Sequence, residues 1–179
     1  AAEILVKYAQ LVVLPYPMAF YYGYREIDAT EWTAPIAIAG LVLYFLFGLL
    51  VVYWFWGKEY LLAFGLLFYC GSIFSYTNLF ISVPGMMGDR FLFIPSIGFT
   101  MLLVGLLMKF FKSDYSARAK VTLANLAKPF TYILLGGLVV YSGMTVARNG
   151  NWKDQLTLFS HDIKTVSESA QAQNLLGIH

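Results

Sequence analysis

Four long stretches of this sequence contain no charged residue, and they limit the fold more than any other feature. The stretches are residues 33–56, 60–83, 91–108 and 129–147. An α-helix needs about 20 predominantly apolar residues to cross the hydrocarbon core of a bilayer. The sequence therefore predicts an all-α integral membrane protein with four transmembrane helices, at residues 33–56, 60–83, 91–111 and 129–147.

The composition agrees with a membrane protein and argues against several soluble classes. Hydrophobic residues make up 59% of the chain and charged residues 12%, about half the charged fraction of a typical soluble domain. The sequence has no P-loop, dinucleotide-binding fingerprint or nucleophile elbow. The net charge of +2 gives no reason to expect a nucleic-acid partner. Cys70 lies in a predicted span and is best explained as a small apolar side chain.

The N-terminal apolar run is too short to span, because Pro15 and Pro17 interrupt it and it also carries Lys7. We expect an interfacial or partial helix here. The sequence opens with Ala-Ala-Glu, without Met or a basic leader, which favours processing or membership of a longer protein. The expected organisation is an interfacial helix with a polar loop, a transmembrane region and a helical tail, at residues 1–32, 33–147 and 148–179.

Basic residues near the ends of the spans predict the orientation. Residues 109–128 carry five basic residues and one acid, and loops rich in Lys and Arg tend to stay in the cytoplasm. This loop and the turn at residues 57–59 are therefore predicted to be cytoplasmic. By alternation, the opposite side receives three polar segments that are distant in sequence: residues 16–32, residues 83–90 and the tail from Arg148.

The tail differs in composition and predicts a pair of helices. Apolar residues recur at spacings of three and four between residues 152 and 166, which is typical of one face of an amphipathic helix. A turn at residues 167–169 and a second helix at residues 170–178 follow. Such a pair cannot bury its apolar faces alone, so we expect further repeats to stack on it. The apolar positions of the first helix are Trp152, Leu156, Phe159, Ile163 and Val166.

The stretch "VPGMMGDRFLFIPSIGF" places an acid and a base, Asp89 and Arg90, between a Pro/Gly-rich turn and a predicted span. In one interpretation, Arg90 only extends toward the membrane interface and Asp89 only complements the dipole of the helix that follows. In the other, this turn holds an anionic headgroup. Arginine can bind phosphate with two parallel hydrogen bonds, and a helix N-terminus adds partial positive charge.

Other polar residues give weaker signals. Glu26, Asp28 and Glu31 could bind a divalent cation or act as a base, but their spacing is equally typical of a solvated face. His161 and His179 have no Cys or carboxylate at metal-ligand spacing. No metal site and no cofactor are therefore predicted.

Three segments together resemble a known family. "MGDRFLFIPSIGF" is similar to the "ERxLYLPSxGF" signature of TMTC-type protein O-mannosyltransferases and their bacterial relatives, which have a GT-C-like membrane fold and a C-terminal tetratricopeptide (TPR) array. "YAQLVVLPYPMAFYYGY" is similar to the upstream "YLxLLLxPxxLSxDYSY" segment. "RNGNWKDQLTLFSHDIKTVSESAQAQNLLG" resembles the junction between the last span and the first repeat. The resemblance runs from about residue 8 to residue 177, and it implies that the tail begins a TPR-like array.

The resemblance implies a lipid-linked sugar donor and an acceptor protein or glycan on the non-cytoplasmic side. It places Arg90 at the donor phosphate, with Asp89 orienting Arg90 and Arg25 as a weaker second phosphate contact. Asp89 stands where the family usually has Glu, and Tyr21 or Tyr22 stands where it often has Asp. These enzymes generally carry the catalytic acid in the first extracytoplasmic loop, which would precede the present residues, so no catalytic residue is assigned.

Two functions remain open on the sequence. One is part of a polyprenyl-phosphate-sugar-dependent glycosyltransferase, this portion shaping the lipid-phosphate site and the link to the repeats. The other is a non-catalytic accessory or structural subunit of a larger membrane complex, whose partners are other subunits and membrane lipids. A transporter or channel is disfavoured because the predicted spans contain no charged residue apart from Lys109 near the end of one of them. Similarity to the bacterial relatives suggests the bacterial inner membrane.

Overall fold

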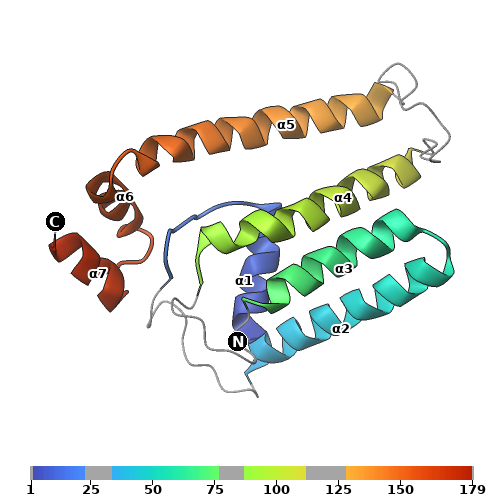
Figure 1. Ribbon diagram of the computed structural model, residues 1–179, viewed down its shortest axis with the longest axis horizontal. Coiled ribbons are helices and arrows are strands. Elements are labelled where there is room, and N and C mark those ends of the chain that lie inside the picture. Colours follow the sequence, from blue (N-terminus) through green and yellow to red (C-terminus); the bar gives the residue numbers. More distant parts are fainter. Residues whose placement is uncertain (1, 23–33, 77–86, 112–127, 179) are drawn as a thin grey trace.

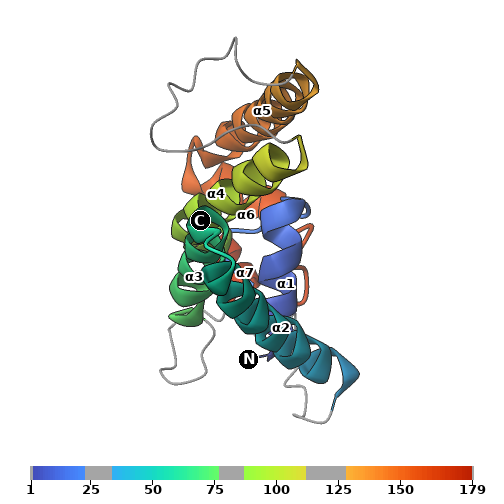
Figure 2. The same ribbon diagram turned by 90° about the vertical axis from the view of Figure 1, so that its right-hand side faces the viewer.

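The computed structural model describes residues 2–22, 34–76, 87–111 and 128–178, and this part of the chain is helical (Figure 1). Within these ranges the chain forms seven α-helices and two short 3-10 helices, and its β pairing is limited to an isolated bridge between Tyr22 and Met87. Helix α3 packs against both α2 and α4, and α1 packs against α2. Helix α5 runs antiparallel to α4, on the side away from α3 (Figures 1 and 2).

Three of the four predicted spans are confirmed as helices that are long and apolar enough to cross a membrane. They are α2 (Pro35–Trp56), the 3-10 helix η1 (Asp89–Leu92) with α4 (Phe93–Phe110), and α5 (Lys128–Asn149) with η3 (Gly150–Trp152). Their outward surfaces are apolar and exposed, which suits contact with lipid chains. The chain is therefore an integral membrane protein by the length and composition of these helices.

The fourth predicted span, residues 60–83, is only partly matched by α3 (Tyr60–Phe74). At 1.5 Å per residue, its 15 residues extend about 22 Å, less than the roughly 30 Å of a hydrocarbon core. The helix ends in a stretch of weak helix formers. There the Ser72 hydroxyl donates to the carbonyl of Phe68 at 2.6 Å, a side-chain bond that competes with regular helix bonding. Residues 77–83 lie outside the described part of the chain.

Helix α1 (Ala2–Val13) forms where the sequence predicts a short N-terminal helix, and it ends before Pro15. Its 12 residues extend about 18 Å, too little to span. One face is buried in the core, through Ile4, Leu5, Tyr8 and Leu11. Whether α1 lies in the membrane interface stays a prediction.

The polar segments that the sequence groups together do meet at one end of the molecule, as far as the structure describes them. The backbone N–H of Tyr22 donates to the carbonyl of Met87 at 2.9 Å, and that of Phe20 donates to the carboxylate of Asp162 at 2.7 Å. At the opposite end, Lys109 Nζ lies 3.0 Å from Glu59 Oε1 of the α2–α3 turn. Which end faces the cytoplasm stays a prediction.

The tail contains two short helices, α6 (Gln155–Asp162) and α7 (Ala170–Gly177). The predicted first helix, residues 152–166, is thus shorter than expected, because Asp154 caps α6 by accepting a hydrogen bond from the N–H of Thr157 at 2.8 Å. Of the predicted apolar face, Phe159 and Val166 are buried, whereas Trp152 and Leu156 are about half exposed. Ser169 caps α7 in the same way. Whether the pair begins a TPR-like array, and where the domain boundaries fall, stay predictions.

Candidate functional site

The Asp89–Arg90 pair lies in η1, directly before α4. This turn is held against the segment that follows α1. The N–H of Asp89 faces the carbonyl of Ala19 at 3.4 Å, and a Cβ on Gly88 would approach the carbonyl oxygen of Phe20 to 2.8 Å. Glycine is therefore required at position 88 by close contact with a neighbouring backbone, and η1 is fixed to residues 19–22.

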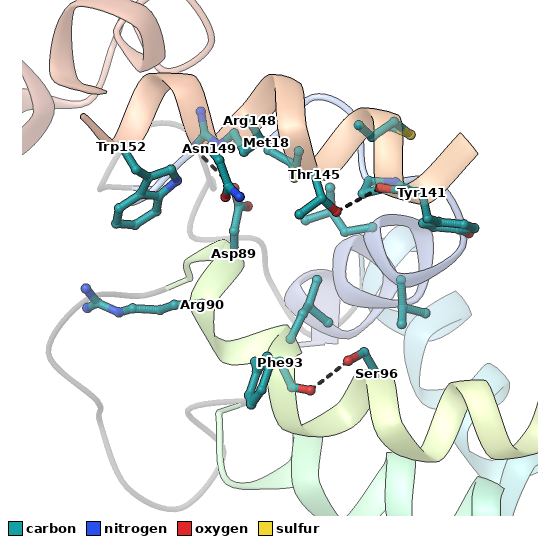
Figure 3. Close-up of a pocket in the computed structure, with 15 residues that line it drawn as sticks. Met18, Asp89, Arg90, Phe93, Ser96, Tyr141, Thr145, Arg148, Asn149 and Trp152 are labelled. Atoms are coloured by element: carbon teal, nitrogen blue, oxygen red, sulfur yellow. Dashed lines mark hydrogen bonds and ion pairs between the residues drawn. The ribbon is translucent and has the colours of Figure 1, made fainter. Parts of the chain in front are cut away.

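A pocket of about 480 Å³ lies between the end of α1, the start of α4 and the end of α5 (Figure 3). The hydroxyl of Tyr141 donates to the carbonyl of Val13 at 2.6 Å and so joins α5 to the end of α1 along one wall. The pocket is lined by Leu11, Val12, Pro15, Met18, Asp89, Arg90, Leu92, Phe93, Ser96, Tyr141, Met144, Thr145, Arg148, Asn149 and Trp152.

Polar and apolar lining residues lie at different levels of this pocket. Since α4 and α5 are antiparallel, residues 89–90 and 148–152 lie at the same end of the two helices, and they supply the charged groups, an amide and an indole. Further along the helices the lining is mainly apolar, with Phe93 and Met144 as examples. The Ser96 hydroxyl there donates to the carbonyl of Phe93 at 2.6 Å and is thereby satisfied internally. This arrangement suits an amphipathic ligand with a polar head and a hydrocarbon chain.

The two predicted residues at this pocket have different surroundings. The carboxylate of Asp89 faces α5, where its Oδ2 lies 3.5 Å from Nη2 of Arg148, and its side chain is 15% exposed. Arg90 is exposed and extends away from that pair (Figure 3), with its guanidinium carbon 5.0 Å from the centre of the Phe91 ring. Their proposed roles in phosphate binding stay predictions.

Arg148 forms the centre of a junction that the sequence did not reveal. Its guanidinium donates two hydrogen bonds to the two carboxylate oxygens of Asp162, with Nη2 at 2.7 Å from Oδ2. The same carboxylate accepts the N–H of Phe20 at 2.7 Å and lies 2.9 Å from Nδ1 of His161. We call Arg148, Asp162, Phe20 and Asp89 the Arg148 junction. It ties α5, α6, η1 and residues 19–22 together.

The Asp162 carboxylate is fully buried, yet it is stabilised in its charged form. Burial by itself raises the pKa of this carboxyl, but hydrogen bonds from Arg148, His161 and the N–H of Phe20 outweigh burial and hold the pKa below its ordinary value. A carboxylate whose pKa is lowered on folding contributes stability above the unfolded pKa of about 3.9, and this contribution is lost as the pH falls through the folded pKa.

We therefore expect the pair formed by Arg148 and Asp162 to keep its full strength between pH 8 and pH 5 and to weaken only below about pH 4. The difference in melting temperature between the wild type and Asp162→Asn, measured in detergent, should be constant over the upper range. Arg148, Asp89 and His161 face the same carboxylate, so the series is repeated with His161→Gln. A difference that already shrinks between pH 7 and pH 5 in both backgrounds would contradict this expectation.

A signal for the junction was present in the sequence. Asp162 falls three residues after Phe159 and four before Val166, on the buried face of the tail, and a charge in an apolar face requires a buried partner. Arg148 directly follows an uncharged run. What the sequence could not supply is their pairing.

Other predicted site residues lie outside the described part of the chain. These include Arg25, the weaker phosphate contact, and the acidic residues Glu26, Asp28 and Glu31. Among the described residues, no group of three or more His, Cys, Asp or Glu side chains is placed to hold a metal ion.

Comparison with known proteins supports a distant relation. The chain is 33% identical over 90 residues to "Protein O-mannosyl-transferase tmtc2" of Xenopus laevis. This alignment covers 49% of the chain and 10% of the frog protein, so the chain spans about a tenth of the length of that relative. No family model and no solved structure matches the chain. The comparison thus shows a distant and partial resemblance to a protein O-mannosyltransferase.

Proposed function

We propose that this chain is part of a membrane glycosyltransferase that uses a polyprenyl-phosphate sugar, and that the pocket between α1, α4 and α5 receives the phosphate end of that lipid. The distant similarity to a protein O-mannosyltransferase supports the reaction class. The resemblance also suggests transfer to a protein or glycan acceptor, with the tail on the non-cytoplasmic side as the link to repeats that present this acceptor.

The observation that carries the proposal is the position of Arg90 at the polar end of an otherwise mainly apolar pocket. Of the three charged side chains in the lining, Asp89 and Arg148 contact each other. Arg90 is exposed and has no carboxylate contact among the residues that the structure describes. A lipid phosphate with its chain along the apolar lining would therefore meet an available guanidinium, the group best suited to bind phosphate oxygens.

Asp89 keeps the task that the resemblance implies, which is to orient Arg90, but in this proposal it acts through the backbone. Its side chain contacts Arg148 and lies at the start of η1, so it orients Arg90 through the backbone of η1. Arg25 is proposed as a second contact of the lipid phosphate. The catalytic acid is not assigned to any residue of this chain.

The proposal is tested with Arg90→Ala in the complete protein reconstituted in nanodiscs. Because a hydrogen bond to a charged group contributes about 1.5–3 kcal/mol, we expect binding of a polyprenyl phosphate to weaken about tenfold or more. Lys153→Ala removes an exposed cation outside the pocket and should bind like the wild type. Arg90→Lys should recover part of the affinity.

Binding and transfer are measured separately, by titration with the lipid phosphate and by sugar transfer from the glycosylated lipid. If Arg90→Ala and Lys153→Ala bind the lipid phosphate as tightly as the wild type, the pocket is not the phosphate site. If the wild type does not bind the lipid phosphate at all, the proposed function is wrong.

A second candidate is a non-catalytic subunit of a larger membrane complex. One observation favours it: Asp89 of the pocket lining and Asp162 of the tail both contact Arg148, so a structural task accounts for them. In that case the complete protein would bind polyprenyl phosphate weakly or not at all, would transfer no sugar, and would purify with other subunits.

A further inference from the structure

We propose that Asp162, in the tail, is a positioning residue for the pocket: without touching the ligand, it fixes where Arg90 stands. This inference rests on the proposed function, because it takes a lipid phosphate to be the ligand of the pocket. A continuous set of contacts leads from α6, through residues 19–22, to η1.

In the first step, Asp162 binds two separate segments of the chain. One carboxylate oxygen accepts the N–H of Phe20 at 2.7 Å, and both oxygens accept hydrogen bonds from Arg148 at the end of α5. The side chain is completely buried, so water does not compete for these bonds. The Phe159 ring, one turn earlier on α6, packs 4.8 Å from the ring of Phe20. Residues around Phe20 are therefore held by the tail.

The second step leads from Phe20 to the turn that carries Arg90. The carbonyl of Ala19 faces the N–H of Asp89 at 3.4 Å, and the N–H of Tyr22 donates to the carbonyl of Met87 at 2.9 Å. Between these two contacts, Gly88 lies against the carbonyl of Phe20 so closely that a Cβ would come within 2.8 Å of its oxygen. Residues 87–89 are thus fixed at three successive positions by the segment that Asp162 holds.

In the third step, Asp162 and Asp89 share one cationic partner, Arg148. Arg148 contacts Asp162 of the tail and, at 3.5 Å, Asp89 of the pocket, and its own side chain is only 10% exposed. When the carboxylate at position 162 is removed, the guanidinium keeps Asp89 as its remaining anionic partner among the described residues. We expect Arg148 to shift as a result, and Asp89, which it contacts, to shift with the η1 backbone, so that Arg90 leaves its position in the pocket lining. Binding should weaken although neither Asp162 nor Phe20 lines the pocket.

The test measures the affinity of the complete protein in nanodiscs for a polyprenyl phosphate, in a cycle of Asp162→Asn and Arg90→Ala. In the wild-type background, where Arg90 is present, we expect Asp162→Asn to weaken binding of the polyprenyl phosphate about tenfold. In the Arg90→Ala background it should change binding less than about twofold, because the residue through which it acts is absent. Asp154→Asn is the matched control, since Asp154 stands on the same tail, is exposed, and bonds to Thr157 within α6.

Gly88→Ala gives an independent arm that changes no charge and remains informative if Asp162→Asn fails to fold. The new Cβ would push η1 away from Phe20, so Gly88→Ala should weaken binding as Asp162→Asn does. In the Arg90→Ala background, Gly88→Ala should cause no further loss of affinity. The inference is overturned if both variants bind like the wild type, or if their losses persist undiminished in the Arg90→Ala background. A wild type that does not bind, or an Arg90→Ala that binds normally, instead rejects the proposed function.

Discussion

Replacing Arg148 by leucine should destabilise the protein by about 3–5 kcal/mol, because it leaves the carboxylate of Asp162 buried without its cation. That side chain is completely buried, and Arg148 provides its two charge-assisted hydrogen bonds. The contacts that remain are those with the N–H of Phe20 and with Nδ1 of His161. The unfolding free energy in mixed detergent measures the effect.

A double-mutant cycle separates the charge effect from simple loss of packing. Asp162→Leu alone should also be strongly destabilising, because Arg148 keeps only its longer contact to Asp89. The double variant Arg148→Leu with Asp162→Leu removes both charges and should be more stable than either single variant, since an apolar pair of similar volume can replace a buried ion pair. Additive losses in the double variant would mean that the two charges do not interact as the structure indicates.

The transmembrane helices were predictable because their signal is local. A run of some 20 residues without charge has few alternatives to a membrane helix, and α2, α4 and α5 follow these runs closely. The end of α3 was not predictable from hydropathy. Serines 72 and 75 are tolerated in apolar runs, but they offer local hydrogen bonds that compete with the helix, and the sequence alone does not say which wins.

The candidate site was predictable only in part, for the same reason. Asp89 and Arg90 are adjacent at the start of a span, so their shared location needed no tertiary information. The Arg148 junction joins positions separated by as many as 142 residues, as in the bond from Phe20 to Asp162. A single sequence shows that Asp162 lies in an apolar face, but only the fold shows which cation lies opposite.

Gly98→Ala should destabilise the membrane region by about 3 kcal/mol, at the upper end of the usual cost of overpacking. Helices α3 and α4 cross at Gly65 and Gly98, where a Cβ on Gly98 would lie 2.6 Å from the backbone nitrogen of Tyr69 and 2.7 Å from the carbonyl oxygen of Gly65. These are backbone atoms of a helix, so they cannot rotate away as a side chain can. The two helices would have to separate, losing van der Waals packing, on which association within a bilayer depends.

Gly136→Ala and Gly143→Ala in α5 are the matched controls, because a Cβ at either position meets no atom within 4 Å. Both substitutions place alanine in the interior of an apolar helix, as Gly98→Ala does, so they share its effect on helix propensity and hydropathy. They should leave the unfolding free energy in mixed detergent unchanged or slightly raised. If Gly98→Ala behaves like these controls, then α3 and α4 do not cross at their glycines. In that case the close packing that carries η1 and Arg90 on the start of α4 would have to be held by other contacts.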